Sequence, residues 1–203
     1  DHGEQPFWMA IMLASMIGQI GLPGGGFGFG YSATNHIGGQ FTILPGAAFP
    51  QAKNEIENFI PVARISDLLL KPNENFNFDG KKYKYPDTKI VYWAGGNPFH
   101  HHQDLNRLIK AWEKPDTIIC NEWCWNTLAK RSDIVLPCTT PLERKDIMMT
   151  PRDPYVVSMS KLVDPYGQAR NDYEIFTGIA KKMGVEKKFT ESRNQEEWQE
   201  WIY

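Results

Sequence analysis

The sequence lacks formal charge over a long N-terminal stretch: from Gln5 to Ala52 no Asp, Glu, Lys or Arg occurs. A stretch of this length cannot all be solvated surface. A membrane span is not expected, because the apolar run Phe7–Ile17 is shorter than the ~20 residues that a bilayer requires, and Gly18 and Gly21 interrupt the residues after it. We therefore expect a buried helix that leads into a buried, glycine-rich loop.

The features of several other protein classes are also missing. Three cysteines are too few for a disulfide framework, and no two are spaced as C-x-x-C, which excludes zinc-ribbon and thioredoxin-type motifs. Lys and Arg number 22 against 24 for Asp and Glu, so a global electrostatic grip on nucleic acid or anionic lipid is not expected. No basic region precedes the apolar run, so a signal peptide is not indicated.

What is present is a globular composition rich in residues that shape loops and large interiors. The 203 residues are 41% hydrophobic and include 17 Gly, 14 Pro and 7 Trp. These numbers favour a loop-rich interior that holds a large ligand, or a piece of a bigger protein. Because the chain opens at Asp1 without Met, we expect an internal fragment.

From Lys89 onward, strands and helices are predicted to alternate. Three apolar runs have the length of strands: Ile90–Ala94, Thr117–Cys120 and Ile134–Leu136. Between the first two, one apolar stripe at helical spacing is formed by Leu105, Leu108, Ile109 and Trp112. A short helix, Thr127–Arg131, separates the second and third. The predicted fold class is therefore α/β, with a parallel sheet flanked by helices in a dinucleotide-binding-like, three-layer arrangement and a loop-rich N-terminal segment.

Other patterns bracket this core. Val62–Leu70 and Asp172–Met183 are predicted helices, and Phe76–Tyr85 is a predicted hairpin with a tight Asp79-Gly80 turn. The polar tail Val185–Tyr203 is expected to cover the surface.

We interpret residues 1–203 as a single α/β domain. Within it, residues 1–52 hold the buried helix and the glycine-rich loop, and residues 89–184 form a β-α-β cofactor-binding core.

Polar and glycine residues follow each predicted strand. GGNPFHHH follows the first (95–102), NEW the second (121–123) and PCTTPLER the third (137–144). Ligands of an open parallel sheet bind outside the carboxyl ends of its strands, and glycines let a ligand approach the backbone. An acidic residue just after the second strand, Glu122, is where such sheets commonly hold ribose hydroxyls. The pattern indicates a nucleotide-like ligand.

Three other motifs are weaker evidence for a nucleotide, metal or phosphate site. Gly28–Ala33 matches G-x-G-x-x-A, but a helix precedes it instead of a strand, so it is not a dinucleotide fingerprint. The side chains of His100–His102 diverge, with no carboxylate or thiol at ligand spacing, so we expect no metal site, although one of them could donate to an anionic ligand. Arg144 is either a phosphate clamp or an ion-pair partner of Glu143 or Asp146.

Several strings together resemble the molybdopterin-dependent N-oxide and S-oxide reductases. The strings are HGEQPFW, GQIGLPGGGFGFGY, YWAGGNPFHHHQDLNRL, DIVLPCTTPLERKD and PYGQARNDYEIF, and they span residues 2–176 in the family's order. The family includes the trimethylamine N-oxide, dimethyl sulfoxide and biotin sulfoxide reductases. Complete members are several times longer, so the resemblance implies an internal segment of a molybdenum oxidoreductase.

The resemblance implies a bis(molybdopterin guanine dinucleotide) molybdenum cofactor, bis-MGD, that takes an oxygen atom from a small-molecule N-oxide or S-oxide, trimethylamine N-oxide first among them. The family's metal ligand is a serine outside this segment, so we predict no metal ligand and no catalytic residue here, and we expect the isolated segment to be inactive. The implied electron donor is a c-type cytochrome or a thioredoxin-like protein. The implied setting is anaerobic respiration in the periplasm, or the cytoplasm for an enzyme like biotin sulfoxide reductase.

The resemblance also assigns cofactor contacts, which fall on the predicted strand ends. They are Asn97, His101, Asn121, Glu122, Arg144 and Asp172. It implies that Asn121 and Glu122 take ribose and guanine and that Arg144 binds phosphate. Asp172 is the implied acceptor for the paired N–H groups of guanine; the less favoured alternative is that it simply caps the helix that runs to Met183. His100 departs from the family pattern, and Pro23–Gly30 is assigned no cofactor atom.

Two other interpretations remain open from the sequence. One is a stand-alone nucleotide-binding module without redox chemistry. The other is a segment of a different molybdoenzyme, of the formate dehydrogenase or nitrate reductase type. The GGNPF string and its following histidines favour the oxide reductases.

Overall fold

The computed structural model describes residues 3–28, 48–51, 53–54, 56, 58–149 and 155–202. The chain divides into two compact units: Asp1–Ala47 with Ile147–Val157, and Ala48–Asp146 with Ser158–Tyr203. Apart from Gly28, the G-x-G-x-x-A string lies outside the described residues. The six predicted site residues all belong to the second unit.

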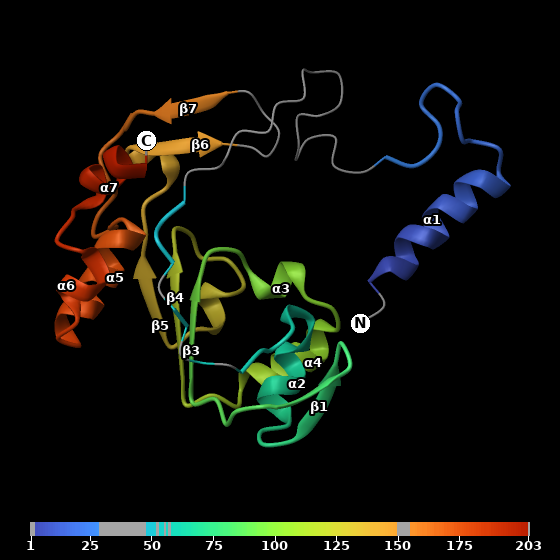
Figure 1. The fold of residues 1–203 in the computed structure, drawn as a ribbon, viewed down its shortest axis with the longest axis horizontal. Coiled ribbons are helices and arrows are strands. Elements are labelled where there is room, and N and C mark those ends of the chain that lie inside the picture. Colours follow the sequence, from blue (N-terminus) through green and yellow to red (C-terminus); the bar gives the residue numbers. More distant parts are fainter. Residues whose placement is uncertain are drawn as a thin grey trace. The chain divides into compact units, whose positions relative to one another are not determined.

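The centre of the second unit is a parallel sheet of three strands in the order β3-β4-β5. The strands are β3 (Ile90–Ala94), β4 (Thr117–Glu122) and β5 (Ile134–Pro137), and their carboxyl ends lie at one edge of the sheet (Figure 1). In this register Ala94 pairs with Asn121 and Glu122 pairs with Pro137. The prediction of three parallel strands is confirmed.

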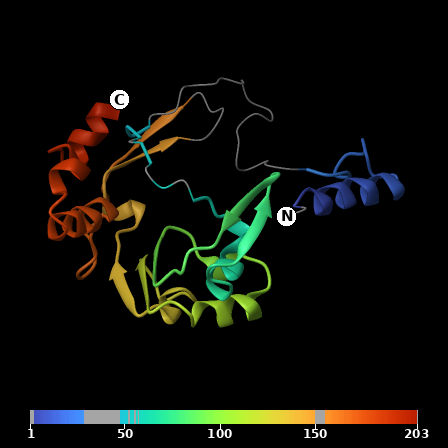
Figure 2. The same cartoon turned by 60° about the horizontal axis from the view of Figure 1, so that its bottom comes forward.

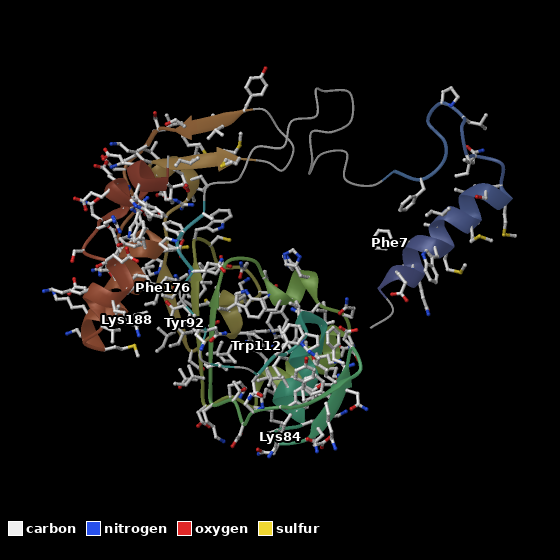
Figure 3. All side chains as sticks on the ribbon, viewed as in Figure 1. Phe7, Lys84, Tyr92, Trp112, Phe176 and Lys188 are labelled. Carbon is white, nitrogen blue, oxygen red and sulfur yellow. The ribbon has the colours of Figure 1, made fainter. Side chains whose placement is uncertain are left out.

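Helices cover both faces of the sheet. Successive residues of β3 point to opposite sides, and its neighbouring residues Trp93 and Tyr92 contact different helices. Trp93 contacts Trp112 of α4 (Leu105–Trp112) with ring centroids 5.9 Å apart. Its neighbour Tyr92 contacts Phe176 of α5 (Asp172–Lys182) at 5.3 Å. Figure 3 shows Trp112 and Phe176 on opposite sides of Tyr92. The predicted three-layer arrangement is therefore present.

The core lies between the sheet, α4 and α2 (Ile65–Leu70). Leu108, Ala111 and Cys120 are completely buried there. Leu108 belongs to the predicted apolar stripe and Cys120 to a predicted strand, whereas Leu105 of the same stripe is 42% exposed. Burying a leucine of this kind contributes roughly 1.5–3 kcal/mol, and Arg107 of α4 forms an ion pair with Asp67 of α2 at the edge of this core.

A β-hairpin precedes the sheet, as predicted. Its strands are β1 (Asn75–Phe78) and β2 (Lys81–Lys84), which lie side by side in Figure 2. Asp79 and Gly80 both have positive φ, at 48° and 70°, as a two-residue hairpin turn requires.

Several elements were not predicted from the sequence. They are α3 (Pro98–His101), η3 (Pro141–Glu143), β6 (Asp146–Met149), β7 (Val156–Met159), α6 (Glu186–Thr190) and α7 (Gln195–Ile202). Two predicted helices are present in part as 3-10 helices: η1 (Val62–Arg64) is the start of the predicted helix Val62–Leu70, and η2 (Ala129–Arg131) lies in the predicted short helix Thr127–Arg131. A signal for α7 was available. Asn194 and Glu197 exchange backbone-to-side-chain hydrogen bonds of 2.9 and 2.7 Å, and this N-x-x-E pattern marks a helix start.

The N-terminal helix α1 (Glu4–Met16) forms, but the expectation that it is buried is not met. Ala14 is its one buried residue, whereas Trp8 and Leu13 are 61% and 60% exposed. A helix with apolar side chains on all sides needs neighbours all round it, and in the first unit one loop contact, Phe7 against Phe27, is described. Among the described residues, no helix is both long and apolar enough to cross a bilayer.

Candidate cofactor-binding cleft

A cleft of about 810 Å³ opens where β3, β4 and β5 end and α5 begins. We name it the sheet-edge cleft. All six predicted site residues line it, namely Asn97, His101, Asn121, Glu122, Arg144 and Asp172. Thr139 also lines it, so the prediction that Asn97, Glu122 and Thr139 gather on one edge is confirmed. Parallel strands bring their carboxyl ends together, which is why residues far apart in the sequence meet here.

The end of β3 turns sharply into the cleft. Gly95 and Gly96 have φ of 79° and 71°, a backbone region that glycine adopts without strain. Asn97 then caps the short helix α3, and its Oδ1 accepts a 3.0 Å hydrogen bond from the amide of Phe99. The side-chain Nδ2 of Asn97 is buried and has no acceptor among the described residues. A buried donor in this state indicates a missing partner.

The end of β4 supplies two buried polar residues, Asn121 and Glu122, which are 3% and 8% exposed. The Asn121 amide is engaged at both ends. Its Oδ1 accepts a 2.7 Å hydrogen bond from the Tyr92 hydroxyl, and its Nδ2 donates one of 2.8 Å to Oδ1 of Asp172.

Glu122 differs from its neighbour, because its carboxylate has no hydrogen bond or ion pair within the described part of the chain. Glu122 is therefore available to a ligand that brings donors of its own.

The segment after β5 brings Arg144 to the cleft. Its Nε donates to Oδ2 of Asp146 at 2.9 Å and its Nη1 donates to the carbonyl of Thr139 at 2.6 Å. Of the two ion-pair partners left open by the sequence, Asp146 is the one used. Glu143 instead accepts from the amides of Thr140 and Tyr166, each at 2.8 Å. The Nη2 group of Arg144 has no partner among the described residues.

The cap of α5 is Asn171, and the possibility that Asp172 caps this helix is wrong. Asn171 forms a capping box with Glu174 and also accepts a 2.8 Å hydrogen bond from the Thr139 hydroxyl. Asp172 is the first helical residue, where the helix dipole favours a negative charge. Its Oδ1 is held by Asn121, while its Oδ2 is unpaired within the described residues.

These charges affect two neutral groups nearby. Burial raises the pKa of Cys138 to about 11, and the charges of Asp172 and Glu122 add to the effect. Burial also raises the pKa of Tyr92, again with a contribution from Asp172. Both groups therefore keep their protons at neutral pH.

One family of known proteins matches most of this chain. The family model described as molybdopterin oxidoreductase matches residues 1–182. This chain belongs to the molybdopterin oxidoreductase family.

Curated relatives in this family are N-oxide and S-oxide reductases. The chain is 48% identical to a biotin sulfoxide reductase of Cereibacter sphaeroides, with all of this chain and 27% of that protein covered. It is 46% identical to a trimethylamine-N-oxide reductase of Haemophilus influenzae, with 100% and 26% covered. Among solved structures, acetylene hydratase from Pelobacter acetylenicus aligns with a TM-score of 0.46 and 23% identity over 51% of this chain and 14% of its own. The chain thus spans about a quarter of the length of the curated relatives it matches.

Membership of the molybdopterin oxidoreductase family implies a molybdenum–molybdopterin cofactor, and the cleft can be tested for its fit. Asn97 offers an unsatisfied donor, Glu122 an unsatisfied carboxylate, and Asp172 and Arg144 one free polar group each. This donor and acceptor set suits a large polar ligand that carries both hydroxyl and anionic groups. Within the described ranges, no cluster of His, Cys, Asp and Glu could hold a metal ion. The residues therefore fit an organic arm of the cofactor.

The three consecutive histidines, His100–His102, have different surroundings. His101 lines the cleft and is exposed, and His100 is exposed outside it. His102 is half-buried against Trp93, and burial lowers its pKa.

Two residues that matter to the cleft were missed from the sequence. Asn126 lines it, and its Oδ1 accepts a 3.0 Å hydrogen bond from the amide of Ala129, the first residue of η2. Tyr92 reaches it only through Asn121, 29 positions away. No local pattern could have indicated that contact.

Proposed function

We propose that the sheet-edge cleft binds one guanine dinucleotide arm of a bis-MGD molybdenum cofactor. The observation that carries the proposal is the Asp172 carboxylate, which lines the cleft, takes no part in the helix cap and has an oxygen unpaired within the described residues. Guanine presents N1–H and N2–H donors side by side, and a carboxylate can accept both in charge-assisted hydrogen bonds. Adenine lacks this donor pair on the same edge.

The other site residues have complementary roles in this proposal. Glu122 accepts from the ribose hydroxyls, because its buried carboxylate has no donor in the described part of the chain. The guanidinium of Arg144 binds phosphate through its free Nη2, since Asp146 and Thr139 already fix its other nitrogens. Asn97 donates from Nδ2, and His101 donates from the exposed rim.

When bound, the cofactor supplies the two-electron chemistry by which an oxygen atom is removed from an N-oxide or S-oxide. We propose this reaction for the protein that contains the chain, with trimethylamine N-oxide as the first substrate to test and dimethyl sulfoxide and biotin sulfoxide beside it. The residues of this chain bind and orient the arm of the cofactor. They do not contact the reacting oxygen in this proposal.

The setting of the reaction is also a proposal. A c-type cytochrome as electron donor accords with anaerobic respiration in the periplasm, whereas a thioredoxin-like donor accords with a cytoplasmic enzyme of the biotin sulfoxide reductase type. Fractionation of cells, followed by detection of the protein with an antibody, separates the two settings.

Guanine selection is tested with the cofactor-free protein by isothermal titration calorimetry with GDP, IDP and ADP. We expect GDP to bind most tightly, because IDP lacks the N2 amine and ADP lacks both donors. Asp172→Asn replaces one acceptor oxygen by a donor and is expected to cost about 1–3 kcal/mol of GDP binding. Asp87→Asn is the matched control, since Asp87 pairs with Lys89 outside the cleft. Equal affinities for the three nucleotides would contradict the proposal.

The reaction itself is tested with reduced viologen and the cofactor-loaded form of the longer protein that contains this chain, because the isolated segment is expected to be inactive. Oxidation of the viologen is expected with trimethylamine N-oxide or a sulfoxide. Turnover with nitrate or formate alone would instead favour the other molybdoenzyme types.

A further inference from the structure

A chain of hydrogen bonds connects the middle of the sheet to the wall of the sheet-edge cleft. The Tyr92 hydroxyl donates to Oδ1 of Asn121 at 2.7 Å, and Nδ2 of Asn121 donates to Oδ1 of Asp172 at 2.8 Å. The three residues come from β3, β4 and α5, and 29 and 51 positions separate the partners. The chain of hydrogen bonds therefore joins two strands and the helix that covers them at one point.

The chemistry of the three groups fixes which one donates and which one accepts in each of these hydrogen bonds. An ionised carboxylate only accepts, so the Asn121 amide nitrogen must face Asp172. The amide oxygen is then turned to Tyr92, whose hydroxyl must donate. Burial and the charge of Asp172 both raise the pKa of Tyr92, which keeps that proton in place.

The tyrosine is itself held from the α5 side. Its ring lies against Phe176, with centroids 5.3 Å apart, and Phe176 lies one helical turn after Asp172 (Figure 3). In the sheet register Ala94 of β3 pairs with Asn121, so the Tyr92 hydroxyl reaches toward the neighbouring strand two residues farther along. Ring and hydroxyl are thus both constrained by residues that border Asp172.

We propose that Tyr92 is a positioning residue for base selection: through Asn121 it holds the Asp172 carboxylate in one rotamer, with its second oxygen ready to accept from the ligand. The proposal rests on the proposed function, in which Asp172 reads guanine. Prior fixing of the acceptor lowers the entropy lost on binding and penalises a base whose donors do not match. Asn121 is then a link between Tyr92 and Asp172, with one acceptor position and one N–H of its amide already used.

The test is Tyr92→Phe, which removes the hydroxyl and keeps the ring beside Phe176. In the cofactor-free protein we expect GDP affinity to fall about 3- to 10-fold, the effect of one neutral hydrogen bond. IDP affinity should fall less, so the GDP-to-IDP ratio shrinks. Tyr83→Phe is the matched control, because Tyr83 stacks on Phe76 in the hairpin, away from the cleft.

A double variant separates positioning from a structural role. In the Asp172→Asn background, Tyr92→Phe should leave the GDP-to-IDP ratio unchanged, because the acceptor that it positions is already altered. If Tyr92→Phe lowers GDP and IDP affinity equally and also lowers the melting temperature, the residue is structural and the inference is overturned. If Tyr92→Phe does not fold, Asn121→Ser breaks the same chain of hydrogen bonds and is expected to shrink the ratio.

The outcomes also distinguish this inference from the proposed function. No preference of the unaltered protein for GDP over IDP would contradict guanine binding at Asp172 itself. A clear preference that Tyr92→Phe leaves intact would overturn the positioning role alone.

Discussion

Two clefts of the second unit can be compared by how far the polar groups that line them are already paired. A groove of about 1000 Å³ is lined by α5, α6 and α7 together with residues 143–145, and we name it the helix groove. In it Lys145 pairs with Glu196 at 2.8 Å, and Nδ2 of Asn171 donates to Gln195 at 2.7 Å. Thr177 has a buried hydroxyl that lacks a partner among the described residues.

The sheet-edge cleft is smaller, at about 810 Å³. Each cleft has one fully buried polar atom without a partner among the described residues, Nδ2 of Asn97 here and the Thr177 hydroxyl in the helix groove. Glu122 and Asn97 are both more than nine-tenths buried, and each has a polar group without a partner in the described chain. Such groups are costly in a folded protein unless a ligand satisfies them. The Glu122 carboxylate, which no described residue pairs, is thus what distinguishes the sheet-edge cleft from the helix groove.

The largest effect is expected where a second carboxylate is placed in the sheet-edge cleft. Asn121→Asp puts two acceptors 2.8 Å apart, where the structure has a donor and an acceptor. We expect GDP affinity, measured by calorimetry near pH 8, to fall on the order of 100-fold through like-charge repulsion. Part of the loss should return near pH 5, because a shared proton restores a donor between the carboxylates.

Asn126→Asp is the control for that variant. It adds the same charge to the same cleft. The Asn126 side chain, however, accepts from a backbone amide, and within the described residues it has no hydrogen bond to a carboxylate. An equal loss of affinity in both variants would show that net charge, and not the Asn121–Asp172 contact, controls binding.

Cys138 and Cys124 are expected to differ in how fast their thiols are modified. Because the pKa of Cys138 is raised from 9.0 to about 11, its thiolate is about 100-fold rarer than that of an ordinary thiol near pH 8. Mass spectrometry after iodoacetamide treatment should show slow modification of Cys138, rising with pH until about 11, and faster modification of the exposed Cys124. Identical pH profiles for the two thiols would contradict the burial of Cys138 at the cleft wall.

The same shift predicts a pH dependence of stability. Above pH 9 the unfolded chain releases the Cys138 proton while the folded protein retains it until about pH 11. This contribution to the free energy of unfolding is therefore constant below pH 9 and decreases as the pH rises toward 11. Cys138→Ala should remove this part of the stability that is lost at alkaline pH, and thermal melting at several pH values measures the difference.

A smaller effect is expected where the two clefts adjoin. Asn171→Ala removes the α5 cap and leaves the buried Thr139 hydroxyl without its acceptor. We expect a loss of about 1–2 kcal/mol in the free energy of unfolding, measured with urea, and less than a 2-fold change in GDP affinity. Asn171→Asp keeps the capping oxygen and should retain most of the stability. Weaker GDP binding at unchanged stability would assign Asn171 to the site instead.

The smallest effect is expected in the helix groove. Lys145→Gln removes the pair with Glu196, but both side chains are exposed, at 62% and 66%, and exposed pairs contribute little. We expect no measurable change in melting temperature or in GDP affinity. A clear loss of GDP binding would remove the distinction between the two clefts, because Arg144 borders both.

Much of the core could be predicted because its signals are local. The strand runs, the apolar stripe through Leu108 and the Asp79-Gly80 turn depend on residues within a few positions of each other. Given three parallel strands, the position of the site at their carboxyl ends is a consequence of topology. The resemblance then selected six residues that the structure brings to that one edge, although their contacts with a cofactor stay a prediction.

Other features depended on contacts that no local pattern contains. Composition indicated that the apolar helix α1 requires burial, but not which residues would cover it, and in the described first unit its side chains remain exposed. The polar tail Val185–Tyr203 was expected to cover the surface, yet Trp198 is buried there against Phe49. Helices α6 and α7 gain stability from such tertiary packing, which propensity alone does not report.

By itself, the sequence determined the alternation of strands and helices, the hairpin turn and the chemistry available at each strand end, because these depend on periodicity and on residue type. Only the tertiary structure decided which polar groups are paired. It assigned the α5 cap to Asn171 and left Asp172 at the cleft, and it placed Tyr92 and Asp172 at opposite ends of the Asn121 amide. The reason is physical: a hydrogen bond acts over about 3 Å in space, whereas these partners lie 29 and 51 positions apart along the chain.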